Sequence, residues 1–106
     1  MSFLVAASQK SLFILQRSQL NYEYNILMSR TNVITSQMAD MANSMSDKDL
    51  DENPTYIAME KTSEYLETQA ESIKDQMSVL DTEISNLQKN ITDGIKNTCT
   101  LNLIGG

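Results

Sequence analysis

Carboxylates are the side chains of this sequence with the most obvious chemistry, and they are densest between Asp47 and Glu52, where the chain reads Asp-Lys-Asp-Leu-Asp-Glu. Carboxylates at alternate positions are typical of the start of a calcium-binding EF-hand loop. Such a loop needs a glycine at its sixth position and a glutamate at its twelfth, where this chain has Glu52 and Ala58. We therefore interpret the segment as a solvated acidic turn and predict no metal site, with weak calcium binding as the alternative.

The other reactive side chains lack the partners that catalysis needs. The chain has no histidine, and neither its single cysteine, Cys99, nor any serine lies beside a candidate base. No glycine-rich loop precedes a helix, so the sequence holds no phosphate-binding cradle. Its seven methionines have no cysteine or histidine partners, which is typical of core filling. We expect no enzymatic activity, no catalytic residue and no cofactor.

The charge of the chain limits its partners. A net charge of −6 at pH 7 opposes unaided binding to the phosphates of nucleic acids and to anionic lipid. No run approaches the roughly 18 consecutive apolar residues of a membrane span. We expect no nucleic-acid partner and no membrane span.

A heptad pattern in the second half of the chain is the strongest structural signal. Its apolar residues are spaced alternately four and three apart, at Leu66, Ala70, Ile73, Met77, Leu80, Ile84, Leu87 and Ile91. This spacing places one narrow apolar stripe along an α-helix, and such a stripe needs a partner helix to cover it. The residues between are mostly polar, so the opposite face is compatible with water.

The first half of the chain carries a matching pattern. Apolar residues recur at every seventh position, at Phe13, Leu20, Leu27, Ile34 and Met41. A second row between them includes the polar residues Arg17 and Thr31, which either fix the register of the helices or lie at the edge of the stripe. No glycine or proline interrupts residues 9–45, so one continuous helix is allowed.

The two patterns predict an all-α fold. We expect a single domain over residues 1–106, built as a long antiparallel helical hairpin with coiled-coil packing that assembles into an oligomer. The first helix is placed at residues 3–45, the acidic turn at 46–53 and the second helix at 54–96, so that each helix has about 43 residues. Asn53 is the expected N-cap of the second helix, with Pro54 at its first position.

The last residues change character. Asp93-Gly94 weakens the helix, and we expect a short tail over residues 97–106. Within it, residues 98–103 alternate polar and apolar as a half-buried strand would. A frayed helix end is the alternative to an extended tail.

Residues 3–15 are too rich in apolar side chains for one stripe, which predicts burial on several faces. One hairpin cannot cover this surface and two stripes, so we expect other copies of the protein to cover it. One end of a monomeric bundle is the alternative. The predicted self-association residues are Phe3, Leu4, Leu12, Phe13, Leu15, Leu66, Ile73, Met77, Leu80, Ile84, Leu87 and Ile91.

A helical hairpin of this length with Asn53-Pro54 at its turn resembles, in layout, the subunits of type III secretion needles and related helical filaments. The secreted hairpins of the WXG100 class have this length too, but they carry a Trp-x-Gly turn, and this chain has no tryptophan. The expected function is a structural, self-assembling subunit of a secreted or surface filament. The alternative is a coiled-coil adaptor or secretion chaperone whose stripe binds a helix of another protein.

The start of the sequence bears on its location. No cationic segment precedes the first apolar patch at residues 3–7, so we expect no Sec-type signal peptide. The sequence leaves the location open. It favours the cell exterior or surface, reached by a route that needs no signal peptide, over the cytoplasm.

Overall fold

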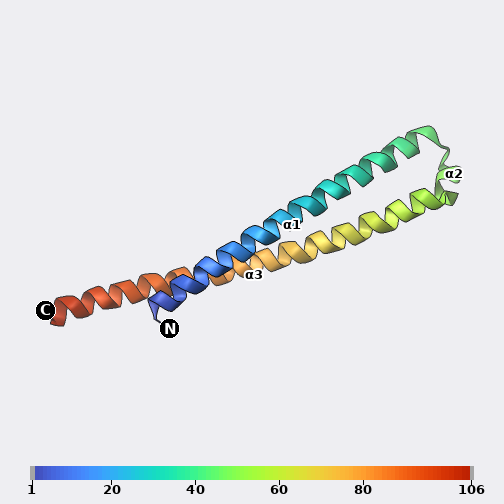
Figure 1. The fold of residues 1–106 in the computed structure, drawn as a ribbon. Helices are drawn as coiled ribbons and strands as arrows, with labels where there is room; N and C mark the ends of the chain where they lie inside the picture. Colours follow the sequence, from blue (N-terminus) through green and yellow to red (C-terminus); the bar gives the residue numbers. More distant parts are fainter. Residues whose placement is uncertain (1, 106) are drawn as a thin grey trace. The chain divides into compact units, whose positions relative to one another are not determined.

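The computed structural model describes residues 2–105, and the side chains of residues 2–99. It contains α1 at Phe3–Ser44, the short helix α2 at Asp47–Glu52 and α3 at Pro54–Gly105. Figure 1 shows α1 and α3 as two long helices joined at one end through α2. Of the described residues, 96% are helical, and the two long helices pack against each other, which confirms the predicted all-α helical hairpin.

Helix α1 begins at a cap that Ser2 provides. The backbone N–H of Val5 donates to Oγ of Ser2 at 3.2 Å, and the N–H of Ala6 donates to the Ser2 carbonyl at 3.0 Å. The first bond satisfies one of the N–H groups that a helix start leaves without partners, and the second is the first backbone bond of the helix. No glycine or proline follows before Ser44, so the helix continues for 42 residues.

The acidic turn contains a helix of its own. Ser46 caps α2 by accepting a hydrogen bond from the N–H of Asp49 at 3.3 Å. Asp47 and Asp49 lie in the first turn of α2, where negative charge is favourable beside the helix N-terminus. Leu50 is the buried residue of this helix. The predicted acidic turn therefore contains a short helix, and its acidic side chains are exposed to solvent as predicted.

Asn53 ends α2 and begins α3. Its own N–H donates to the Leu50 carbonyl at 3.1 Å, while its side-chain Oδ1 accepts from the N–H of Tyr56 at 3.0 Å. Its backbone is extended, at φ −77° and ψ 118°, as the steric demands of the following proline require. The prediction of Asn53 as N-cap with Pro54 at the first helical position is confirmed.

Helix α3 is longer than the sequence indicates. The sequence places its end near Lys96 with a tail beyond, but α3 continues to Gly105 and has 52 residues against the 42 of α1. The prediction of an extended, strand-like tail at residues 98–103 is wrong, because these residues are helical. Extending an existing helix by one residue costs far less free energy than starting a new helix. The short alternating pattern at residues 98–103 therefore does not end α3. Residue 106 of the predicted tail lies outside the described residues.

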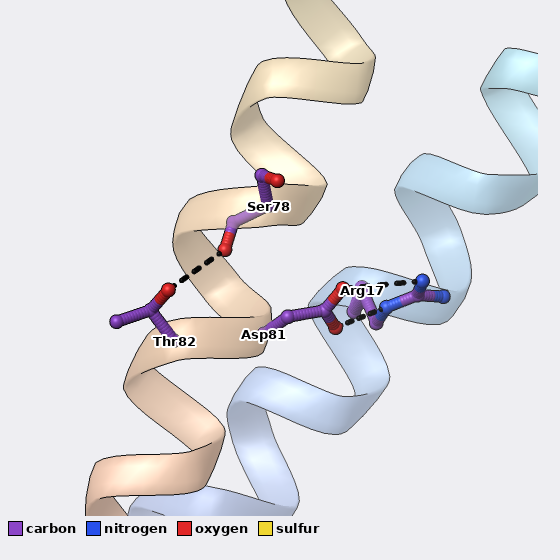
Figure 2. Close-up of polar contacts among 4 residues, drawn as sticks. All are labelled: Arg17, Ser78, Asp81 and Thr82. Atoms are coloured by element: carbon purple, nitrogen blue, oxygen red, sulfur yellow. Dashed lines mark hydrogen bonds and ion pairs between the residues drawn. The ribbon is translucent and has the colours of Figure 1, made fainter.

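The hairpin divides into two compact units, and the first contains α1 up to Leu20 and α3 from Gln76 onward. In this unit Nζ of Lys10 donates to Oε1 of Gln88, and Arg17 forms an ion pair with Asp81. Figure 2 shows the Arg17 side chain meeting Asp81 of α3, directly before Thr82, whose hydroxyl donates to the Ser78 carbonyl. Arg17 lies seven residues after Lys10 on α1, and its partner Asp81 lies seven residues before Gln88 on α3. The two helices are therefore antiparallel, and their contacts repeat with the heptad.

The second unit spans Asn21–Asp75 and contains the rest of α1, the whole of α2 and the start of α3. Its buried residues are Thr31, Leu50, Leu66 and Ala70. The buried hydroxyl of Thr31 donates to the Leu27 carbonyl of its own helix at 2.9 Å. Thr31 is therefore a polar residue inside the stripe that needs no partner from α3.

Burial along each helix follows the heptad. On α1 the buried and half-buried residues include an unbroken series, Phe3, Ala6, Lys10, Phe13, Arg17, Leu20, Tyr24, Leu27, Thr31, Ile34, Met38 and Met41. On α3 the series is Tyr56, Met59, Ser63, Leu66, Ala70, Ile73, Met77, Leu80, Ile84, Leu87, Ile91 and Gly94. Steps of three and four alternate throughout both series, which is coiled-coil packing. We call this pair of series the seam.

Candidate self-association surfaces

The carboxylates of the turn lie on the short helix α2 and its ends. Because Asp47–Glu52 is helical, its acidic side chains do not follow the path of an EF-hand loop. Among the residues that the structure describes, no group of three or more histidine, cysteine, aspartate or glutamate side chains could hold a metal ion. Cys99 is a free, exposed thiol. Within the described helices, none is long and apolar enough to cross a membrane.

The predicted self-association residues of α3 all lie in the seam. Leu66, Met77 and Leu87 are buried. The half-buried residues are Ile73, Leu80, Ile84 and Ile91. These side chains form the face of α3 that packs against α1 of the same chain, and the half-buried ones keep part of their surface exposed.

The predicted residues of α1 separate into two groups. Phe3 and Phe13 belong to the seam and are half-buried. Leu12 is exposed, and Leu4 and Leu15 keep 68% and 66% of their surface exposed. Leu4 and Leu15 are three helical turns apart and lie on one side of α1, about half a turn away from the seam. The predicted set therefore combines residues used within the hairpin with residues that the hairpin leaves uncovered.

Further exposed side chains extend the uncovered group. Val5 and Ile14 are exposed on the same turns of α1 as the leucines. We define the N-terminal apolar surface by its residues, Leu4, Val5, Leu12, Ile14 and Leu15. An exposed apolar surface of this kind is typical of an interaction site on a soluble protein.

Sequence reasoning missed a second surface, a groove in the second unit. It has a volume of about 410 Å³ and is bordered almost wholly by apolar atoms. Its lining consists of Ser29, Arg30, Val33 and Ile34 of α1 with Thr62, Tyr65 and Leu66 of α3. Val33 and Tyr65 fall outside the heptad series and are exposed. The available signal was that each immediately precedes a seam residue, Ile34 or Leu66.

The flank of α3 opposite the groove is acidic. Four exposed glutamates, Glu60, Glu64, Glu67 and Glu71, are spaced four, three and four residues apart and so form one row along the helix. At 100° per residue, this glutamate row lies to one side of the seam, while Thr62 and Tyr65 lie to the other. Lys74 follows the row and offsets part of its charge.

The two candidate surfaces differ in chemistry. The N-terminal apolar surface is uncharged, whereas the groove has apolar walls and includes a cationic residue, Arg30, among the residues that line it. No known protein family, curated protein or solved structure matches this chain.

Proposed function

We propose that this chain is a structural, self-assembling subunit whose assembled form is a secreted or surface helical filament. The observation that carries the proposal is the exposure of Leu4 and Leu15, at 68% and 66%, on the side of α1 that faces away from α3. Water surrounds these side chains in a single hairpin. A second copy that covers them would remove this apolar area from water, which favours association.

The energy of this contact suits an assembly that depends on repetition. Fully burying a leucine stabilises by about 1.5 to 3 kcal/mol, so covering a side chain that is two-thirds exposed contributes on the order of 1 to 2 kcal/mol. A few such leucines offset only part of the cost of joining two molecules. Association is then favoured when each copy makes the contact more than once, as a subunit of an extended assembly does.

The thin core of the hairpin also supports the proposal. Among the described residues, no large side chain is fully buried, and most of the seam is only half-buried. In a hairpin of two helices, no further helix covers the seam. Helical bundles usually bury such a seam among three or four helices. Neighbouring copies can supply those helices. If the contact joins different surfaces of successive copies, it produces an open filament or a closed ring.

The test is size against concentration, measured by light scattering with negative-stain microscopy of the same sample. We expect particle mass to rise with concentration and long uniform fibres to form. Leu15→Ser should raise the concentration at which assembly begins. Val79→Ser is the matched control, because Val79 is 61% exposed but lies outside the N-terminal apolar surface. Circular dichroism should show the same helix content in all three proteins.

Other results would redirect the interpretation. A small species of constant mass over about a hundredfold range of concentration contradicts the filament, because open assembly responds to mass action. It would favour the alternative, an adaptor or secretion chaperone that binds a helix of another protein. If Leu15→Ser and Val79→Ser change the assembly concentration equally, the N-terminal apolar surface is not the contact between copies.

A further inference from the structure

We propose that the groove of the second unit receives the glutamate row of a second copy, so that hairpins associate flank to flank. This inference rests on the proposed function, because it names a contact through which copies join. The groove is the surface lined by Arg30, Val33 and Tyr65. The docking element is the flank of α3 that carries Glu60, Glu64, Glu67 and Glu71.

An exposed cationic residue, Arg30, is one of the residues that line the apolar groove. Arg30 lines it and forms no ion pair or side-chain hydrogen bond with any residue that the structure describes. Lys61 adds a second cation immediately before the lining residue Thr62. A guanidinium pairs with a carboxylate through two parallel hydrogen bonds, so an acidic helix is the partner that this wall fits best.

The glutamate row supplies the complementary charge. Its four carboxylates extend along about 16 Å of helix, at 1.5 Å for each residue. The same flank of the hairpin presents Met28 of α1 and Ile57 of α3, both exposed apolar side chains. It can therefore place carboxylates against Arg30 and apolar groups against Val33 and Tyr65. Apolar contact supplies affinity, and the charges fix orientation.

The positions of the two surfaces allow a second copy, but not the same chain, to be the partner. Within the second unit, the groove and the glutamate row lie on opposite flanks of α3, so one chain cannot bring them together. Each copy thus carries one groove and one glutamate row. When two copies join, the groove of one and the glutamate row of the other remain uncovered. A contact between different surfaces of identical copies repeats, and it generates a ring or an open filament. The row of like charges on one flank also disfavours pairing that flank with itself.

The test uses charge reversal in the full chain. Arg30→Glu should raise the concentration at which assembly begins by at least about tenfold, because it opposes acidic groups across the contact. Lys48→Glu is the matched control: it changes the net charge equally, at an exposed position of α2 outside both surfaces. The paired variant Glu64→Arg/Glu67→Arg should weaken assembly in the same way.

Mixing the two variants gives the decisive result. In an alternating assembly of Arg30→Glu copies and Glu64→Arg/Glu67→Arg copies, every contact joins opposite charges, so the mixture should assemble where neither variant does alone. If wild-type protein assembles and Arg30→Glu behaves like Lys48→Glu, this inference is overturned while the proposed function stands. If wild-type protein does not assemble at any concentration, both fail.

Discussion

Arg17 and Asp81 lie 64 residues apart in the sequence, and their side chains join α1 to α3. Nε of Arg17 is 2.5 Å from Oδ1 of Asp81, and a second guanidinium nitrogen is 3.4 Å from Oδ2 (Figure 2). Arg17 occupies a heptad position that an apolar side chain would normally fill. A slip of the helices by one heptad would separate this pair and also the pair of Lys10 with Gln88.

The ion pair should contribute little to stability, although Arg17 lies in the seam. Its side chains are 39% and 53% exposed, and ion pairs in water are typically worth about 0 to 1 kcal/mol. We expect a double-mutant cycle of Arg17→Ala and Asp81→Ala, measured by urea unfolding, to give a coupling energy below about 1 kcal/mol. Raising the salt concentration should reduce it further. A coupling above about 2 kcal/mol that is insensitive to salt would contradict this account.

Gly94 allows the start of α1 to approach α3 closely. A Cβ added at Gly94 would lie 2.8 Å from Cβ of Phe3, which is closer than two such atoms can approach. Gly94→Ala should therefore lower the free energy of unfolding by about 1 to 2 kcal/mol, because overpacking outweighs the better helix propensity of alanine. Thermal and urea unfolding would measure the change.

Two controls separate the close contact from the effect on the helix itself. Ser85→Ala, at an exposed position of α3, gains helix propensity without a new contact and should be neutral or slightly stabilising. Phe3→Gly removes the opposing Cβ, so adding Gly94→Ala to it should cost nothing. A destabilisation that persists in this double variant would show that the approach of Phe3 is not its cause.

Asn53 should stabilise the turn through its side chain. Asn53→Ala loses the hydrogen bond from the N–H of Tyr56 and should lower the free energy of unfolding by about 1 kcal/mol. Asn53→Asp retains an acceptor and should behave like the wild-type protein. Circular dichroism during thermal unfolding makes the comparison. Equal losses from both substitutions would mean that the cap contributes nothing specific.

Most of the fold could be predicted from local pattern. The heptads at residues 66–91 and the turn residues at Asn53-Pro54 indicate a helical hairpin, because stripe spacing and caps depend on neighbours within a few residues. The end of α3 could not be placed this way. Gly94 weakens a helix in isolation, but here it lies in the seam against Phe3, a residue 91 positions away.

The candidate surfaces were predicted only in part. Sequence reasoning identified Leu4, Leu12 and Leu15, because residues 3–15 hold more apolar side chains than one stripe can use. It also included the seam residues of α3, since composition does not show whether a stripe faces its own chain or another. The groove at Arg30, Val33 and Tyr65 was missed, because its two walls belong to helices that are distant in the sequence.

The sequence by itself therefore determined that the chain forms two long helices with stripes on one face and an acidic, proline-bearing turn between them. Helix formation, capping and heptad spacing are local properties, so nearby residues suffice to specify them. Only the tertiary structure decided which apolar side chains the hairpin covers. Leu66 is buried because it lies on the face of α3 that packs against α1, and Leu15 stays exposed because it lies on the side of α1 that faces away from α3.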